Sequence, residues 1–385
     1  MNQVVIGLGF GDEGKGLVVD WLCSQSQFVP TVVRFSGGHQ VGHTVVVGKT
    51  RHVFSNFGSG TLRECPTHWS KFCTVEPIKL CEELDELKDK VPHPLLYLDN
   101  DCPITTPYDV LSNRVLEGNN KHGSVGVGFG ETIERQEKHY SLTVRDLFYP
   151  KIFFSKFDAI RDYYRKKLGN SFFNDLDKDE SPIDINLFAY SCGKINEQSK
   201  HIHPVDSVRK SVVYIFEGSQ GLLLDKDYGF FPHVTRSNTG TKNIPELITN
   251  DMDIEFYLVT RAYQTRHGNG FMTNEGRPHN IKENPEETNI DREFQGKFRR
   301  TILDVSLLEY GMSKDKMISN TRKKSLVITC LDHVKNAWSY TYNNEFFHCK
   351  SESEFVDQIA CLLNIDKVFI SNSPDSSNIM RFSGR

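Results

Sequence analysis

The stretch "GLGFGDEGKG", residues 7–16, indicates the fold of the chain around it. It follows "QVVI", a β-branched apolar run typical of a buried strand, and precedes "LVVDWLC", whose apolar residues have helical spacing. Strand, glycine loop and helix form the setting in which G-x-x-x-x-G-K, here Gly9 to Lys15, binds phosphate. The residue after the lysine is Gly16, where a magnesium-binding Ser or Thr is usual. The sequence therefore predicts an α/β nucleotide-binding fold with an altered phosphate loop.

Two acids, Asp12 and Glu13, occupy this loop where a phosphate is expected. Carboxylates repel phosphate unless a metal ion lies between them or one of them handles a proton. Because the usual hydroxyl ligand is missing, Asp12 is a candidate both for a magnesium ligand and for a general base. The loop thus favours phosphoryl transfer to an acceptor that must itself lose a proton. A simple GTPase needs no such base.

The composition of the 385 residues argues against several classes of protein. The formal net charge of −4 leaves no basic excess with which to bind nucleic acid generally. Nine scattered cysteines without a C-x-x-C pair argue against a zinc site or a disulfide framework and favour a reducing compartment. The first ten residues lack signal-peptide features, and no apolar run approaches the roughly 18 residues of a membrane span. We therefore expect a cytoplasmic globular protein that binds neither nucleic acid nor membrane.

A second glycine-rich stretch, "SGGHQVGHT" (36–44), follows a second apolar run. His39 and His43 are four residues apart, but the neighbouring glycines and the β-branched residues after Thr44 speak against a helix that presents both to a metal. A lone histidine is usually structural or on the surface. One that lies between glycines beside a nucleotide loop is a better candidate for acid catalysis.

Together, "GDEGKG" and "GGHQVGHT" closely resemble two motifs of the adenylosuccinate synthetase family, the second of which usually reads G-G-x-N-A-G-H-T. The resemblance covers nearly the whole chain. Further matches follow in the family's order: "GSGTLRE" (58–64), "HGSVGVGFG" (122–130), "FEGSQGLLLDKDYGFFPHVTRSNT" (216–239), "RAYQTRHGNG" (261–270), "FRRTILD" (298–304), "ITCLD" (328–332) and "ISNSPD" (370–375).

This resemblance implies a ligase of purine biosynthesis that condenses the 6-oxo group of IMP with L-aspartate, driven by GTP hydrolysis through a 6-phosphoryl intermediate. Asp12 would take the proton from purine N1, His43 would stabilise charge on O6 and the transferring phosphoryl group, and Lys15 would hold the triphosphate. Mg²⁺ would be bound by Asp12 and the carbonyl of Gly42. The residues implied to bind the triphosphate are Gly11, Glu13, Gly14, Lys15, Gly16, Thr44, Asp332 and Ser371.

Other matched positions imply the pockets of the two remaining substrates. The purine monophosphate would be bound by Gln40, Ser124, Val125, Gln220, Leu224 and Thr235, although core packing is an equal interpretation of Val125 and Leu224. Gln40 replaces the family's asparagine, and Ser124 and Val125 replace two phosphate-binding threonines. The amino-acid loop, T-T-G-R-x-R in the family, reads "FQGKFRR" here. The residues implied to bind the amino acid are Gln295, Lys297, Arg299 and Arg300, with Phe294 at the position of the first threonine.

Two of the implied substrates have alternatives: the triphosphate, GTP or ATP, and the purine monophosphate, IMP or dGMP. The family reads guanine with T-K-L-D, whose aspartate accepts from two guanine donors that adenine lacks. Here Asp332 is kept, while Cys330 replaces the lysine and Ser373 a glycine beside Ser371. The short chain is also similar to a phage and archaeal branch, some of whose members make 2-aminoadenylosuccinate from dGMP with ATP or GTP. Those carry a serine at the loop aspartate, so Asp12 favours the IMP reaction.

Functions of other classes remain open at this stage. A GTPase switch would use the loop without a second substrate, and a non-catalytic or regulatory GTP-binding paralogue would explain the altered loops. The switch predicts hydrolysis that a purine monophosphate does not affect, and the paralogue gives no reason to retain Asp12, Lys15 and His43 together. A Rossmann dehydrogenase is disfavoured because "GLGFGDEG" lacks the third-glycine spacing.

The order of the segments predicts one domain, 1–385. Expected strands lie near 3–8, 31–36, 212–216, 255–260, 325–330 and 367–371, alternating with helices. The resemblance implies a large, mostly parallel sheet with helices on both faces. A helical insertion is predicted near 151–210, with the apolar residues of 155–178 on one face, and residues 273–293 are predicted to form a mobile loop that closes over the site. The resemblance also implies a homodimer, with His139 at the position of an arginine that reaches the partner's substrate.

Overall fold

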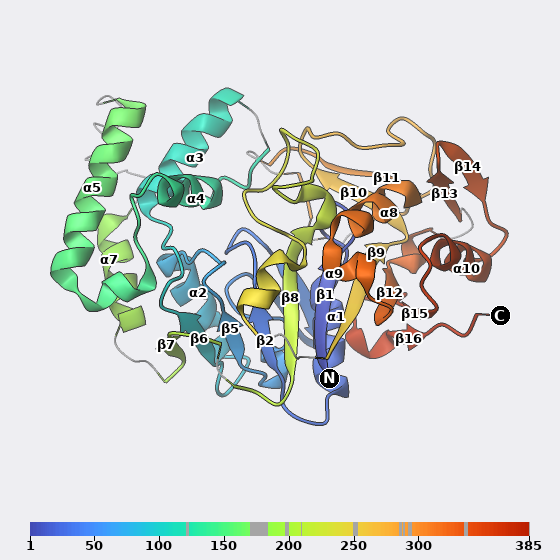
Figure 1. The fold of residues 1–385 in the computed structure, drawn as a ribbon, viewed down its shortest axis with the longest axis horizontal. Coiled ribbons are helices and arrows are strands. Elements are labelled where there is room, and N and C mark those ends of the chain that lie inside the picture. Colours follow the sequence, from blue (N-terminus) through green and yellow to red (C-terminus); the bar gives the residue numbers. More distant parts are fainter. Residues whose placement is uncertain are drawn as a thin grey trace.

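One large sheet runs through the middle of the molecule (Figure 1). The computed structural model describes residues 1–120, 123–169, 184–196, 200–208, 210–248, 253–284, 287, 289–291, 295–334 and 338–384. In spatial order the strands of the sheet are β16 (Met380–Arg381), β15 (Lys367–Ile370), β12 (Lys324–Thr329), β9 (Ile254–Arg261), β1 (Asn2–Gly7), β8 (Tyr214–Gly221), β2 (Thr31–Arg34), β5 (Thr67–Trp69), β6 (Leu96–Asp99) and β7 (Ile202–Val205). Every pair is parallel except β15 with β16.

Residues of the central strands alternate between two cores because successive side chains of a strand point to opposite faces. In β1, Val4 and Ile6 lie in one core and Val5 in the other, and all three are inaccessible to solvent. Burial on both faces explains why parallel strands read as unbroken apolar runs. The strands predicted near 3–8, 31–36, 212–216, 255–260, 325–330 and 367–371 correspond to β1, β2, β8, β9, β12 and β15. The predicted fold class is confirmed.

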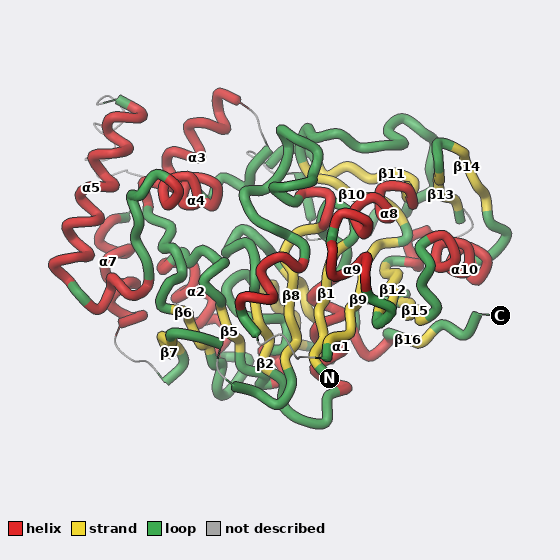
Figure 2. The backbone as a smooth tube through the Cα atoms, viewed as in Figure 1, coloured by secondary structure: helices red, strands yellow, loops and turns green. Residues whose placement is uncertain are grey.

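Helices cover both faces of this sheet (Figures 1 and 2). The helix α1 (Lys15–Gln25) packs on the face that carries Val5. On the opposite face lie α8 (Val305–Lys314), α9 (Lys316–Asn320) and α10 (Glu352–Leu362). Short 3₁₀ segments connect the larger elements: η1 (Thr61–Arg63), η2 (Val144–Phe148), η3 (Leu222–Leu224), η4 (Thr241–Glu246), η5 (Leu331–Val334) and η6 (Ser376–Asn378).

A mainly helical region forms one end of the molecule, to the left in Figure 1. It contains α3 (Pro107–Asn120), α4 (Phe129–Glu137), α5 (Pro150–Leu168) and α7 (Ile185–Asn196), and α2 (Pro77–Lys88) lies between it and the sheet. The apolar face predicted for 155–178 is present in α5, where Phe157, Ile160, Tyr163 and Leu168 belong to one core cluster, whereas 170–178 lie outside the described residues. At the end of the predicted insertion, β7 joins the main sheet.

Two smaller sheets lie beside the main one. The first consists of β10 (Tyr263–His267), β11 (Phe298–Asp304), β13 (Ser339–Tyr342) and β14 (Glu345–His348), and the second is a hairpin of β3 (His43–Val47) and β4 (Thr50–Phe54). The predicted loop 273–293 has neither helix nor strand in its described residues. No helix in the described part of the chain has the length and apolarity to cross a membrane.

Candidate functional site

A cavity of about 1380 Å³ opens where β1, β2, β8, β9 and β12 end. Ligands of parallel α/β sheets bind at the carboxyl ends of the strands, because the connecting loops converge there. The walls come from segments that are far apart in the sequence, including the glycine loop, the residues after β2 and β8, and the residues after β12.

The carboxylate of Glu13 holds the glycine loop together from within. It accepts hydrogen bonds from the amides of Gly9 (3.0 Å) and Gly11 (2.8 Å) and pairs with the Nζ of Lys15 at 2.9 Å. Glycine is required at position 7, because a Cβ there would lie 2.2 Å from Glu13 Oε2. Glu13 is buried and lies outside the cavity lining, so its carboxylate bonds to the loop and does not reach the triphosphate site that the sequence predicted for it.

Side chains from three other strands bind the carbonyls of the loop. Thr265 Oγ1 donates to the carbonyl of Gly11 at 3.4 Å, Arg261 Nε donates to that of Asp12, and Thr329 Oγ1 donates to that of Glu13 at 2.7 Å. The carbonyls are therefore satisfied by the protein, while Gly14, Lys15 and Gly16 at the start of α1 line the cavity. Free amides at a helix N-terminus are an anion-binding arrangement. The loop has the geometry of a phosphate cradle.

Asp12, the other acid of the loop, faces the cavity. Its backbone lies in the left-handed region, with φ at 63°, and its side chain is 24% exposed. Its Oδ2 lies 3.4 Å from Nε2 of His267, at the end of β10. The two acids therefore differ in position, since Glu13 bonds to the loop and Asp12 is available to a ligand.

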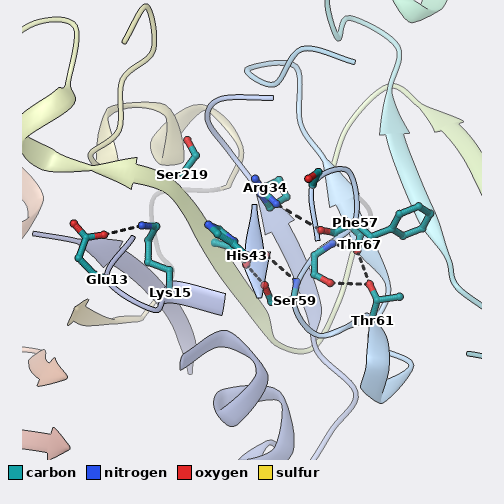
Figure 3. Close-up of polar contacts among 12 residues, drawn as sticks. Glu13, Lys15, Arg34, His43, Phe57, Ser59, Thr61, Thr67 and Ser219 are labelled. Carbon is teal, nitrogen blue, oxygen red and sulfur yellow. Dashed lines mark hydrogen bonds and ion pairs between the residues drawn. The ribbon is translucent and has the colours of Figure 1, made fainter. Parts of the chain in front are cut away.

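His43 lines the cavity and is fixed there by a buried carboxylate. Figure 3 shows His43 beside Ser59, with the Glu13–Lys15 pair of the glycine loop nearby. Its Nδ1 lies 2.5 Å from Oε1 of Glu217, and the other carboxylate oxygen accepts from the amide of Ser59 at 3.0 Å. The Nε2 of His43 has no hydrogen-bond partner among the described residues. A Cβ at Gly16 would lie 2.8 Å from His43 Cβ, so the missing hydroxyl of the phosphate loop leaves room for this histidine.

The charges of this pair follow from burial and proximity. Burial lowers the pKa of His43 to about 4, against the opposing effect of Glu217. Burial opposes ionisation of Glu217, but His43, Arg34 and Ser59 outweigh it and lower the pKa of this carboxyl to about 2. Glu217 is therefore ionised, and the neutral imidazole carries its proton on Nδ1. Sequence reasoning missed the roles of Glu217 and Ser59, although both lie within quoted motifs.

All six residues predicted to bind the purine monophosphate line the same cavity as Asp12: Gln40, Ser124, Val125, Gln220, Leu224 and Thr235. Ser124 is held in place by its neighbours. Its hydroxyl donates to Asn113 Oδ1 at 3.2 Å, and its amide donates to Glu117 at 3.1 Å. The structure thus brings together residues separated by up to 195 positions in the sequence.

The structure brings only one of the residues predicted to bind the amino acid to the cavity wall. Only Gln295 lines the cavity; Lys297, Arg299 and Arg300 do not, and Phe294 lies outside the described residues. Arg299 pairs with Glu275 at 2.6 Å and donates to the carbonyl of Gly270.

Arg266, which sequence reasoning missed, lies opposite Arg299 in the β10–β11 register and does line the cavity. Burial lowers the pKa of Arg266 to about 10, and the charge of Arg299 adds to this effect. It lies in the quoted motif "RAYQTRHGNG", which could have drawn attention to it.

Asp332, Cys330 and Ser373, which follow β12 and β15, also line the cavity. Ser371 is buried outside the lining and donates to the carbonyl of Ser373 at 2.9 Å. His333 lies beside Asp332, 3.5 Å from Nε2 to Oδ2, and burial lowers its pKa. This histidine was not singled out from the sequence.

The oxygen donors expected for magnesium are present. Asp12 and Gly42 both line the cavity, as does the predicted triphosphate residue Thr44. Within the described residues no group of three or more His, Cys, Asp and Glu side chains forms a metal site. Mg²⁺ often binds through one or two carboxylates together with substrate phosphates, so this donor set fits it.

The cavity at the ends of the parallel strands, the glycine loop and the acid within that loop together are typical of an α/β nucleotide-binding protein. A family model described as adenylosuccinate synthetase matches residues 4–368. The chain belongs to this family, which confirms the resemblance found in the motifs.

Relatives and solved structures agree with this assignment. The chain is 33% identical over 280 residues to the adenylosuccinate synthetase of Acidithiobacillus ferrooxidans and 32% identical over 291 residues to that of Bordetella avium. Each match covers 70% of this chain, which spans about 64% of the length of these relatives.

Two solved structures share the fold. Adenylosuccinate synthetase from Plasmodium falciparum has a TM-score of 0.75 at 18% identity, with 99% of this chain and 100% of that chain covered. Cyanophage S-2L succinoaminodeoxyadenylate synthetase, bound to dGMP and dATP, has a TM-score of 0.63 at 12% identity, with 98% and 94% covered.

Proposed function

We propose that this chain is a purine nucleotide ligase that condenses the 6-oxo group of IMP with L-aspartate, driven by GTP hydrolysis through a 6-phosphoryl intermediate. The observation that carries the proposal is that Asp12, Lys15 and His43 line one cavity together with the predicted monophosphate residues. Family membership supports the same reaction.

Each of these side chains has a chemical role in the proposal. Asp12 takes the proton from purine N1, which makes O6 nucleophilic toward the γ-phosphate. Lys15 and the amides that follow Asp12 hold the triphosphate in place. His43, held at Nδ1 by Glu217, takes up a second proton at Nε2 when the negative charges of O6 and the phosphates are bound beside it, and its Nε2–H then donates to O6 and the transferring phosphoryl group. Catalysis is then mostly positioning and neutralisation of charge.

The proposal extends to the surroundings of the site. Mg²⁺, held by Asp12 and the carbonyl of Gly42, would neutralise charge on the phosphates. For aspartate, the cavity lining offers Gln295 of the predicted aspartate loop and Arg266, which lies opposite Arg299 in the β10–β11 register. We also propose one domain over 1–385, a homodimer and a cytoplasmic location.

The test is a reaction with defined products. Purified protein is incubated with IMP, GTP, L-aspartate and Mg²⁺, and the products are identified by mass spectrometry. We expect adenylosuccinate, GDP and phosphate in equal amounts, and none of them when IMP is omitted. GTP hydrolysis that proceeds equally without IMP would instead indicate a switch, and no turnover at all would indicate a non-catalytic paralogue.

A second candidate function is synthesis of 2-aminoadenylosuccinate from dGMP with ATP or GTP. The observation that favours it is the shared fold with the phage enzyme, together with Cys330 in the base site. Parallel reactions with dGMP, and with ATP in place of GTP, distinguish the two. If Asp332 reads guanine, Asp332→Asn removes a GTP preference of about 2–3 kcal/mol, typical of a charged hydrogen bond. An enzyme that prefers ATP before mutation would contradict guanine recognition.

A further inference from the structure

Arg261, the last residue of β9, has a guanidinium bonded on several sides. It is 6% exposed and contributes to the wall of the cavity. Its Nε donates to the carbonyl of Asp12, and its Nη1 donates to the hydroxyl of Tyr263 at 2.7 Å and to Oε2 of Glu287 at 2.8 Å. Glu287 is itself held by the amide of Asn289 at 3.1 Å.

The carbonyl that Arg261 binds belongs to a residue with an unusual backbone. Asp12 lies at φ 63°, in the left-handed region, which costs a residue with a Cβ about 1 kcal/mol and which aspartate adopts more readily than most residues. Such a conformation persists only when its surroundings fix it. Loss of the hydrogen bond to this carbonyl would leave the backbone of Asp12 free to leave the left-handed region, and a change in its φ would move the carboxylate within the cavity.

The shape of the guanidinium suits this position better than a simple positive charge does. The planar guanidinium donates to the Asp12 carbonyl, Tyr263 and Glu287 from two nitrogen atoms held in one plane. The ammonium of lysine has a single nitrogen atom and cannot reproduce this geometry. The group also lies 5.5 Å from the ring of Tyr263 and 5.9 Å from that of Phe298. These contacts fix the orientation of the guanidinium plane as well as the position of its charge.

We propose that Arg261 is a positioning residue that holds Asp12 in its reactive backbone conformation, and that Glu287 keeps Arg261 oriented for this role. The proposal rests on the proposed function only in that Asp12 is taken as the base.

Two measurements on Arg261→Lys, Arg261→Met and Glu287→Gln test the proposal, with Arg145→Met as control. Arg145 also pairs with two acids, Asp101 and Asp206, but lies on the surface away from the cavity. We expect kcat for ligation to fall about 100-fold in both Arg261 variants, the cost typical of a displaced catalytic group. The Kd for GTP should change less than about threefold, since the loop amides remain. Glu287→Gln should lower kcat in the same direction but less.

The second measurement is the rate of hydrogen–deuterium exchange at the backbone amides of residues 7–16, which does not depend on enzyme turnover. Exchange should become about tenfold faster in both Arg261 variants and stay unchanged in Arg145→Met. Full activity of Arg261→Lys, or unchanged exchange in both variants, would overturn the proposal, because a charge near the triphosphate would then suffice. If wild-type protein shows no ligation while exchange still rises, the proposed function fails and the role of Arg261 stands.

Discussion

The glycine-loop end of the site and the predicted amino-acid end, which lies mostly outside the cavity lining, are built in different ways. At the loop end, the ion pair Lys15–Glu13 and the hydrogen-bonded pair His43–Glu217 are almost entirely buried. At the amino-acid end, Arg299 pairs with Glu275, whose side chain is 48% exposed, and Arg300 lies 3.6 Å from Glu283, which is 91% exposed. Exposed ion pairs contribute little to stability, whereas breaking a buried pair leaves an uncompensated charge. The loop end is therefore preorganised, and the pairs at the other end can be exchanged for a ligand's carboxylate.

Substitution of Asp12 tests the preorganised end most severely. Asp12→Asn keeps the size of the side chain but removes the base and weakens the metal site, so ligation should fall by about 10³–10⁴-fold. Triphosphate binding, measured by calorimetry, should be retained. Near-normal turnover would show that another group takes the proton.

Glu217→Gln is expected to have the next largest effect. An amide in place of the carboxylate removes the charge that orients His43, and kcat should fall about 100-fold with little change in any KM. Glu345→Gln, at an exposed position of β14, is the control. A large rise in the KM for GTP instead of a loss of kcat would assign Glu217 to binding.

Arg299→Leu tests the exchangeable end. If aspartate takes the place of Glu275, the KM for aspartate should rise about 10–100-fold while the affinities for triphosphate and purine change little. An unchanged KM for aspartate would indicate that Arg266, which lines the cavity, binds the aspartate carboxylate instead. Activity with another amine and not with aspartate would show that the loop serves a different nucleophile.

The smallest effect concerns the stability of the buried sheet next to the loop end. Burial lowers the pKa of His68, in β5, to about 4, below its ordinary value of 6.5. The unfolded chain therefore takes up a proton between pH 6.5 and 4 that the folded chain does not, and stability is lost as the pH falls through this range. This histidine accounts for about 2.5 kcal/mol of the loss between pH 7 and 4.5.

Urea unfolding at the two pH values measures this contribution. His68→Leu should lose less stability on acidification than wild type, whereas His93→Leu, at an exposed position, should match wild type. Burial also raises the pKa of Glu76 and Glu131 to about 7, but both groups are present in all three proteins and cancel in the comparison. Equal pH dependence in all three would contradict burial of a neutral His68.

A structural feature could be predicted from the sequence where the residues that produce it lie close together in the chain. Strand β1, the glycine loop and α1 were predictable because apolar period and glycine spacing act within about 20 residues. The role of Glu13 in bonding its own loop is also local, yet a carboxylate beside a phosphate motif suggested ligand chemistry. His43 was found from its motif, but its partner Glu217 lies 174 positions away and depends on how β2 and β8 pair.

The amino-acid end was the hardest to predict for a physical reason. Arg299 and Arg300 stand out in the sequence as a basic pair, but in β11 they point to opposite sides and find their own partners. Arg266 became part of the cavity wall through the register of β10 with β11, which no single segment specifies.

The carbonyls of the glycine loop are bound by donors at positions 261, 265 and 329, far along the chain from residues 11–13. A nascent chain that has emerged only as far as α1 has every residue of the cradle but none of these donors. One donor alone matters little to the triphosphate, but β9, β10 and β12 bring all three donors together with Asp332 of the cavity wall, so the triphosphate should bind tightly only after these strands have docked, and its affinity reports completion of the sheet. Once bound, it stabilises the finished fold by mass action and adds little to any shorter intermediate.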